Sequence, residues 1–414
     1  SLMTVTAPAD IDTAFSDFMP TFGLNMRQFD MMMKIYKILS QKYDVVCTNP
    51  PYMGGSGMNA KLSEFVKSKF PDYKSDLFST FVIRCTQLCK AEGYLGFLTP
   101  YVWMFIQSYE KMRNYIYSTR TIETLIQFEY SAFEEATVPI CTFALKNSKV
   151  NKKGVYLRLT DFRGGMEVQR QKTLEAIADH KCGYYFETNS ANFSKIPGSP
   201  VAYWVSENFI RAFERGISID SISDFTGSQH ITANNDKYLR LHWEIDANKV
   251  GMGKKWVYYA KGGDFRKWYG NIELVVDWSE GAVQYYKTNS TSNLLAEKYR
   301  FKEGITYTEL TSSVNTFRYL PPVCIFDKKG PSIVSVKKLW YCLGIFGTKI
   351  APLYFAILNP TLSTQVRDVK NLPIIVNGEI EPKIDEIVKE NVEICKQDWN
   401  DFETSWGFEK HPLI

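Results

Sequence analysis

An alternation of helix and strand patterns between residues 25 and 147 constrains the fold of this chain more than any other feature. The helix patterns lie at residues 25–42, 76–90 and 109–117, and the strand patterns lie at residues 43–48, 94–100, 122–128 and 140–146. Such alternation is typical of a doubly wound α/β sheet. Because no helix pattern separates the last two strands, we expect them to form an antiparallel edge of that sheet.

The second half of the chain follows a different pattern. Short strands and long loops rich in Gly, Trp and Tyr fill residues 237–340, and helix patterns return near residues 347–359 and 384–399. This indicates a separate, mixed α+β region. The domains predicted from these changes are residues 1–165, a linker at 166–200, a second domain at 201–383 and a helical segment at 384–414.

Composition excludes several classes of protein. The net charge of the 414 residues is only +4, so a nucleic-acid partner requires a local basic patch. The eight cysteines form no CxxC pair and there are only four histidines, so we expect reduced thiols and no metal site. Neither a signal peptide nor a membrane span is apparent, and we expect a cytosolic protein.

The stretch "YDVVCTNPPYMGGSG" (43–57) carries the strongest chemical signal. The apolar residues 43–48 predict a short buried strand. It runs directly into Asn49, Pro50, Pro51 and Tyr52, at the kind of strand end where open α/β sheets bind ligands. The exocyclic amine of adenine is a poor nucleophile because its lone pair is delocalised into the ring. An Asn oxygen and the Pro50 carbonyl can accept both amine hydrogens and free that lone pair. Tyr52 can stack on a base that has left the duplex.

The alternative is that Asn-Pro-Pro simply forms a rigid turn after a strand. For an isolated motif that interpretation would be preferred, but the strand before it and the strand–helix order after it favour catalysis.

The ordered motifs resemble those of γ-type amino-methyltransferases that act on adenine in DNA, and more narrowly the PglX-type methyltransferases of bacterial BREX phage-defence systems. The stretches that carry the resemblance are "DVVCTNPPY", "KSDLFSTFVIRCTQLCKAEGYLGFLTPYVWMF", "ATVPICTFALKN", "AKGGDFRKWYGNIELVVDW" and "ILNPTLSTQVRDVKNLPI". The resemblance covers roughly residues 40–412. It implies a partial Rossmann-like methyltransferase sheet followed by a target-recognition domain, with S-adenosylmethionine as cofactor and double-stranded DNA as substrate.

The resemblance also implies roles for single residues. Asn49 and Pro50 would hold the target amine, Tyr52 would stack on the adenine, and Phe143 would hold the base from its other side. Asp76 and Phe78 are candidates for the rim of the cofactor pocket. For Phe143 a core strand position is an equally good interpretation, and for Phe78 a helix core position is the better one.

One expected element is missing. Enzymes of this type bind S-adenosylmethionine at a glycine-rich turn before the NPPY motif, whereas residues 1–43 contain the single glycine Gly23. The "GGSG" at 54–57 follows the motif and is expected to be a flexible loop of the active site. We therefore expect the chain to be the C-terminal portion of a longer enzyme, without a full cofactor site.

A basic and aromatic stretch marks the predicted recognition domain. Residues 237–270 hold eight Lys or Arg and three acidic residues, interleaved with Trp, Tyr and Phe. A solvated loop face is the alternative, but after an NPPY motif such a stretch favours contact with DNA phosphates. The candidate DNA-binding residues are Lys254, Lys255, Lys261, Arg266 and Lys267.

Three functions remain open from the sequence. The first is adenine-N6 methylation of DNA in phage defence or restriction–modification. The second is a non-catalytic module that binds DNA or other phage-defence proteins. The third is methylation of RNA or of protein glutamine, which uses similar turns.

Overall fold

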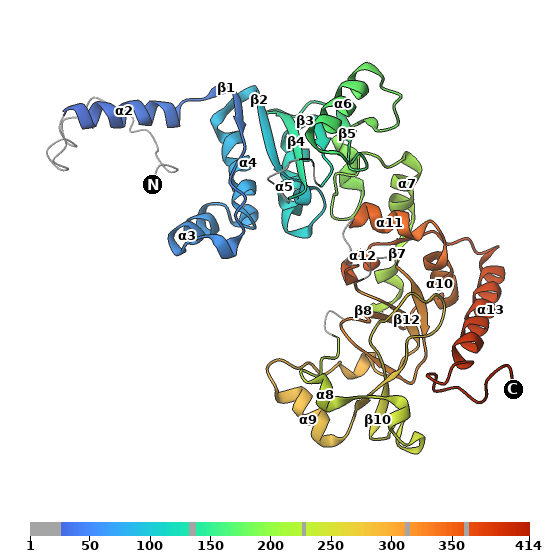
Figure 1. Ribbon diagram of the computed structural model, residues 1–414. Helices are drawn as coiled ribbons and strands as arrows, with labels where there is room; N and C mark the ends of the chain where they lie inside the picture. Colours follow the sequence, from blue (N-terminus) through green and yellow to red (C-terminus); the bar gives the residue numbers. More distant parts are fainter. Residues whose placement is uncertain (1–25, 131, 133–137, 226–228, 311–314, 360–363) are drawn as a thin grey trace. The chain divides into compact units, whose positions relative to one another are not determined.

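A computed structural model describes residues 26–130, 132, 138–225, 229–310, 315–359 and 364–414. The chain divides into two compact units, Ser1–Trp204 and Val205–Ile414 (Figure 1). Each unit has its own hydrophobic core.

The first unit contains one six-stranded sheet with helices around it. In chain order its elements are α2 (Met26–Ser40), β1 (Tyr43–Thr48), α3 (Ala60–Lys69), α4 (Leu77–Leu88), β2 (Cys89–Pro100), α5 (Glu110–Thr119), β3 (Thr121–Gln127), β4 (Ile140–Lys146), β5 (Gly154–Arg158), α6 (Gly165–Ala178) and β6 (Tyr185–Thr188). The strand order is β1-β2-β4-β3-β5-β6. Strands β1, β2, β3 and β5 are parallel to one another, and β4 and β6 are antiparallel to them. The predicted α/β sheet is thus confirmed.

The antiparallel strand β4 lies in the interior of the sheet, so the prediction of an antiparallel edge formed by 122–128 and 140–146 is wrong. Residues of β4 pair with β2 on one side and with β3 on the other. Its side chains are buried at alternate positions, among them Cys141, Phe143 and Leu145. An apolar strand of this kind is stabilised best where both of its edges are paired.

Strand β1 stands at the end of the sheet. It pairs in parallel with β2, and Val45 keeps 58% of its surface exposed. The expectation that residues 43–48 form a buried strand is therefore wrong for this structure. Apolar composition indicated burial on both faces, whereas among the described residues β1 has one neighbouring strand.

Residues 166–200 are not a linker. They supply α6 and the edge strand β6, and the segment after β6 is tied to the core by the buried side chain of Arg113. Its Nη2 donates to the Gly198 carbonyl at 2.6 Å, its Nε to the Ser199 carbonyl at 3.0 Å, and its Nη1 to the Trp103 carbonyl at 2.6 Å. Pro197, Gly198 and Pro200, residue types that are common in linkers, lie in a turn of the first unit that the Ser199 N–H closes on the Ile196 carbonyl.

The second unit is a mixed α+β arrangement, as predicted. Its elements are α7 (Glu207–Arg215), β7 (Ile217–Ser218), β8 (Asp224–Phe225), α8 (Asn235–Tyr238), β9 (Leu239–Leu241), β10 (Trp256–Ala260), β11 (Leu274–Asp277), α9 (Glu280–Thr288), β12 (Gly304–Tyr307), β13 (Phe317–Leu320), β14 (Cys324–Phe326), β15 (Ser332–Val334), α10 (Leu339–Gly347), α11 (Ala351–Leu358), α12 (Val366–Lys370), β16 (Pro373–Ile374) and α13 (Glu381–Asn400). Two four-stranded sheets, β14-β10-β11-β9 and β13-β12-β15-β8, and the pair β16-β7 form its framework.

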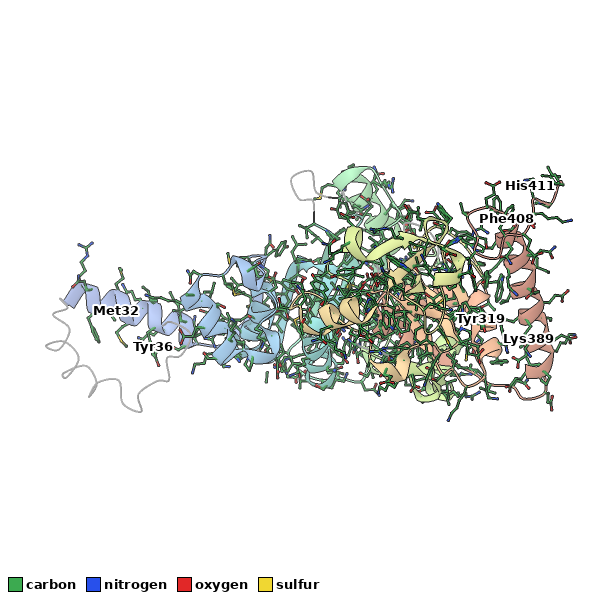
Figure 2. All side chains as sticks on the ribbon, turned by 90° about the horizontal axis from the view of Figure 1, so that it is seen from below. Met32, Tyr36, Tyr319, Lys389, Phe408 and His411 are labelled. Atoms are coloured by element: carbon green, nitrogen blue, oxygen red, sulfur yellow. The ribbon has the colours of Figure 1, made fainter. Side chains whose placement is uncertain are left out.

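Helix α13 belongs to this unit, although a separate segment at 384–414 was expected. It packs on α10, where Val388 faces Gly344. The aromatic rings of Tyr319 and Trp340 stack at 5.1 Å, and Lys389 of α13 lies over the Trp340 ring. Tyr319 and Lys389 are labelled in Figure 2. These contacts place the C-terminal helix against the body of the second unit.

Within the described residues, no single helix is long and apolar enough to cross a membrane. Helices α10 and α11 pass that test only when taken together, and the pair is bent by 80°.

Candidate functional site

The NPPY turn leaves the end of β1 on the edge where the parallel strands of the first unit terminate (Figure 1). Asn49 and Tyr52 are exposed to solvent, whereas Pro50 is buried. A rigid buried proline between two exposed functional side chains limits the movement of the turn. This strand end is the place where ligands bind to open α/β sheets.

Tyr52 contacts Asn49 directly. The Tyr52 hydroxyl lies 2.9 Å from Asn49 Oδ1 and 3.2 Å from the carbonyl oxygen of Leu98 in β2. Burial and the neighbouring Cys141 raise the pKa of the Tyr52 hydroxyl, so it remains a donor at neutral pH. Donation to Oδ1 orients the carboxamide of Asn49, and a second lone pair of that oxygen is left for a ligand.

Asp76 holds the segment that follows the NPPY turn. Its Oδ1 accepts from the Met53 backbone N–H at 2.9 Å and from the Phe78 N–H at 3.1 Å. The second bond caps the N-terminus of α4, and Leu77 N–H donates to the Met53 carbonyl. The sequence predicts Asp76 at the rim of the cofactor pocket. The structure places it as a bridge between the segment after the NPPY turn and α4.

Phe78 and Phe143 are core residues in this structure. Phe78 is 1% exposed and meets the Tyr52 ring edge-on, with a centroid distance of 6.4 Å. Phe143 is 2% exposed and packs between Phe97 and Trp103, with centroid distances of 5.1 and 4.9 Å. This burial favours the core interpretation of both residues, and contact of Phe143 with a base stays a prediction.

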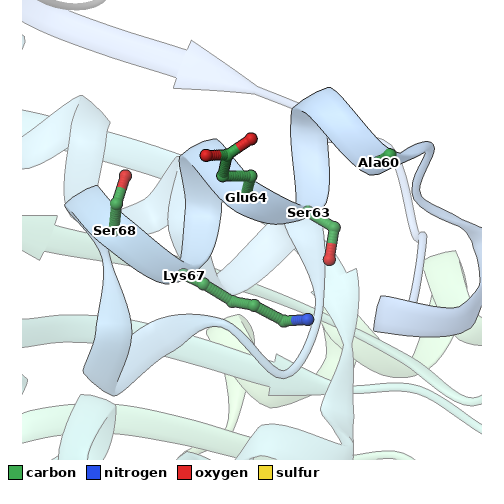
Figure 3. A pocket seen from close by; sticks show the side chains of 5 residues that line it. All are labelled: Ala60, Ser63, Glu64, Lys67 and Ser68. Atoms are coloured by element: carbon green, nitrogen blue, oxygen red, sulfur yellow. The ribbon is translucent and has the colours of Figure 1, made fainter.

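The glycines after the motif form a short turn rather than an extended loop. Gly55–Gly57 is a 3-10 helix closed by the Gly57 N–H on the Gly54 carbonyl, and α3 follows with Asn59 as its cap. A shallow hollow on α3 is lined by Ala60, Ser63, Glu64, Lys67 and Ser68 (Figure 3). This hollow lies along one face of a single helix and includes no residue of the NPPY turn.

The expectation that this chain lacks a full cofactor site stays a prediction. The glycines at 54–57 follow the parallel strand β1, and Gly164 and Gly165 follow the parallel strand β5 and open α6; both sets of glycines come after the NPPY motif. Of residues 1–43, in which the absence of a glycine-rich turn was noted, residues 1–25 lie outside the described part. The described part holds no group of three His, Cys, Asp or Glu placed to bind a metal ion.

The predicted DNA-binding residues lie on loops of the second unit and differ in their surroundings. Lys254 and Lys255 are exposed before β10, and Lys267 is exposed beyond it. Arg266 pairs with Asp398 at 2.8 Å and lies over the Trp399 ring at 4.7 Å. Arg266 thus binds its loop to α13, and its guanidinium is less available to DNA than the sequence suggested.

The glycines beside Lys261 also have a structural explanation. Gly262 adopts a φ of +84°, and a Cβ there would lie 2.7 Å from the Lys329 carbonyl oxygen. Only glycine fits such a contact. The close approach to Gly262 is made here by the chain's own backbone at Lys329.

Sequence reasoning missed Tyr101 after β2 and Arg158 at the end of β5, which lie at the carboxyl ends of parallel strands, and Trp204, whose ring contacts Arg158. Arg158 lies over the Trp204 ring at 5.0 Å. The available signal was a basic residue at the end of a strand that runs parallel to β1. This signal can be recognised only when the order and direction of the strands in the sheet are known.

Known proteins resemble this chain in sequence and fold. Residues 10–133 match the family described as Eco57I restriction-modification methylase. The chain is 33% identical over 391 residues to the adenine-specific methyltransferase BrxX of Escherichia coli O9:H4 (strain HS), and 31% identical over 406 residues to the adenine-specific methyltransferase PglX of Lacticaseibacillus casei (strain Zhang). These alignments cover 91% and 92% of this chain, and 31% and 33% of the two relatives.

The fold has a counterpart among solved structures. The type IIL restriction-modification enzyme MmeI, solved in complex with DNA, superposes with a TM-score of 0.54 at 10% identity. The match covers 89% of this chain and 52% of MmeI, and it shows a shared fold. Over nine tenths of its length, the chain is thus similar to a segment of about one third of the PglX-type adenine-specific methyltransferases, which confirms the resemblance predicted from its motifs.

Proposed function

We propose that this chain carries the catalytic turn and target-recognition region of an enzyme that methylates the N6 amine of adenine in double-stranded DNA, with S-adenosylmethionine as the methyl donor. The observation that carries the proposal is the exposed Asn49 oxygen, oriented by Tyr52 at the end of a parallel strand. The likeness to adenine-specific methyltransferases over nine tenths of the chain supports it.

The role of the turn is to accept hydrogen bonds from the exocyclic amine of adenine. Asn49 Oδ1 accepts one hydrogen of the adenine amine and the Pro50 carbonyl accepts the other, which localises the nitrogen lone pair. The Tyr52 ring, 37% exposed, offers a stacking surface to a base that has left the duplex. Bound S-adenosylmethionine supplies the electrophilic methyl group.

The second unit contributes DNA affinity. Lys254, Lys255, Lys261 and Lys267 lie on loops around β10 and carry positive charge toward phosphates. Arg266 acts by fixing the loop against α13 rather than by reading a base. Association with other phage-defence proteins and a cytosolic location stay predictions.

The test replaces Asn49 by Ala in the enzyme that contains this chain. We expect methylation of duplex DNA to be lost while DNA affinity is retained, because Asn49 contributes to the reaction and not to the phosphate contacts. Asn114→Ala, on the exposed face of α5, is the matched control and leaves turnover unchanged. Equal turnover of the Asn49 variant and the control would disprove the assignment.

A substrate panel separates the other functions. Duplex DNA, tRNA and a peptide with a glutamine are offered with S-adenosylmethionine carrying a labelled methyl group. We expect label in DNA alone. Label in tRNA or in the peptide would favour the third function, and DNA binding without any label would favour the non-catalytic module.

A further inference from the structure

The NPPY turn lies at the carboxyl ends of the parallel strands. These ends form a row across the sheet from β1 to β5, which we call the strand-end edge. Asn49 follows β1, Tyr101 follows β2 and Arg158 is the last residue of β5. Since β1, β2 and β5 run parallel, these residues lie at the same edge of the sheet. Four strand spacings separate β1 from β5, so the edge spans roughly 19 Å between Asn49 and Arg158.

The guanidinium of Arg158 is held in place, but its partners among the described residues leave most of its N–H donors without an acceptor. It lies over the Trp204 ring at 5.0 Å, and Nε donates to Thr160 Oγ1 at 3.2 Å. Among the described residues, neither terminal amino group has an acceptor, and no carboxylate lies within ion-pair distance. A partly buried arginine in this state presents a fork of donors suited to bidentate contact with an anion.

The aromatic support beneath the guanidinium is itself rigid. Trp204 meets Tyr203 edge-on at 5.0 Å and Phe105 at 5.9 Å, and Phe105 contacts Tyr101 at 6.3 Å. The buried Tyr203 hydroxyl donates to Gln127 Oε1 at 2.9 Å, which anchors the cluster to the end of β3. Arg158 therefore sits on a fixed platform, and a ligand that binds it meets little loss of side-chain freedom.

The simpler interpretation is that Arg158 and Trp204 stabilise each other by cation–π attraction alone. That attraction uses one face of the guanidinium and none of its N–H groups. The unused donors and the position on the catalytic edge favour a ligand.

We propose that Arg158 binds a backbone phosphate of the DNA that carries the target adenine, with Trp204 as the residue that positions it. The proposal rests on the proposed function for its substrate and adds a phosphate site to it. At a rise of about 3.4 Å per nucleotide, the span of the edge places this phosphate roughly five or six nucleotides from the target base.

The test measures DNA affinity as a function of salt in the enzyme that contains this chain. In Arg158→Ala, the negative slope of log K against log salt decreases in magnitude by about 0.9, the contribution of one phosphate. Arg158→Lys keeps the slope but binds more weakly, because an ammonium lacks the planar fork. Arg170→Ala, which removes an exposed arginine paired with Glu167 on α6, is the control and leaves the slope unchanged.

Single neutral methylphosphonates, placed at each position around the target adenine in turn, locate the phosphate. We expect a methylphosphonate at one position, roughly five or six nucleotides from the adenine, to lower the DNA affinity of the wild-type enzyme. The same methylphosphonate should not change the DNA affinity of Arg158→Ala. In Trp204→Leu, DNA affinity is reduced, and the only methylphosphonate whose effect becomes smaller than in the wild type is the one at that same position. An unchanged slope in Arg158→Ala, or equal sensitivity of wild type and variant at every position, overturns the phosphate site.

Failure of this inference differs from failure of the proposed function. If the wild-type enzyme methylates DNA and Asn49→Ala abolishes the reaction, an unchanged slope in Arg158→Ala overturns the phosphate site alone. If the wild-type enzyme does not bind DNA, both are overturned.

Discussion

Replacement of Asp76 tests whether the catalytic turn is held by α4. In Asp76→Ala, the backbone N–H groups of Met53 and Phe78 lose their acceptor. Loss of a helix cap costs about 1 kcal/mol, and loss of a hydrogen bond to a charged group costs about 1.5–3 kcal/mol. We expect local stability to fall by about 3 kcal/mol, since the Met53 bond adds to the cap.

Asp76→Asn is the matched variant, because both bonds are made by Oδ1 and an amide oxygen retains them. The assay is hydrogen exchange of the Met53 and Phe78 amides. In the Ala variant exchange is faster by about a hundredfold, and in the Asn variant by less than about tenfold. The rate of methylation follows the same order, since a loosened turn no longer fixes Asn49.

Equal exchange in the Ala and Asn variants would refute this role of Asp76. If both variants instead weakened S-adenosylmethionine binding equally without changing exchange, Asp76 would act at the cofactor, as the sequence predicts.

Three further changes test other features. Tyr52→Phe keeps the ring but removes the donor to Asn49 Oδ1, so single-turnover methylation slows by about tenfold while DNA affinity is retained; an unchanged rate would mean that the hydroxyl does not orient Asn49. Arg113→Met leaves the Trp103 and Gly198 carbonyls without this donor, whereas the Ser199 carbonyl still accepts from the Tyr117 hydroxyl, and denaturant unfolding of the first unit shows a loss of at least about 2 kcal/mol; a loss no larger than in an exposed Arg163→Met control would contradict this. Burial lowers the pKa of His230 to about 3. Because the unfolded chain takes up a proton near pH 6.5 and the folded unit does not, stability of the second unit is present above that pH and falls by about 2 kcal/mol between pH 7 and pH 5. His230→Phe removes that pH dependence, and an equal slope in both proteins would refute it.

Local patterns predict the elements of the first unit well. The strand pattern at 43–48 coincides with β1, and the helix pattern at 76–90 contains α4, with Asp76 as its cap. Apolar periodicity and cap chemistry are properties of neighbouring residues, so they can be read from a short window of sequence. The strand order depends on contacts between distant residues, and for this reason the interior position of β4 was not foreseen.

The candidate site was predictable to a similar extent. The NPPY turn is defined by four consecutive residues, and its place at a strand end is as expected. The link between Tyr52 and Asn49 and the bridge made by Asp76 depend on side-chain geometry, which sequence spacing does not contain. Arg266 illustrates the opposite error, since its local basic surroundings concealed an ion pair with Asp398, far away in the sequence.

The central position of β4 has a consequence for biosynthesis. Chains leave the ribosome N-terminus first, at about 5–20 residues per second, and 40 positions separate the end of β2 at Pro100 from the start of β4 at Ile140. For a few seconds β2 therefore has one unpaired side, and β3 cannot join it until β4 is made. Such an open side is a template for association with other nascent chains. In pulse-labelled refolding, we expect the amides of β2, β3 and β4 to become protected in one step, and earlier protection of β3 would show that the sheet assembles in another order.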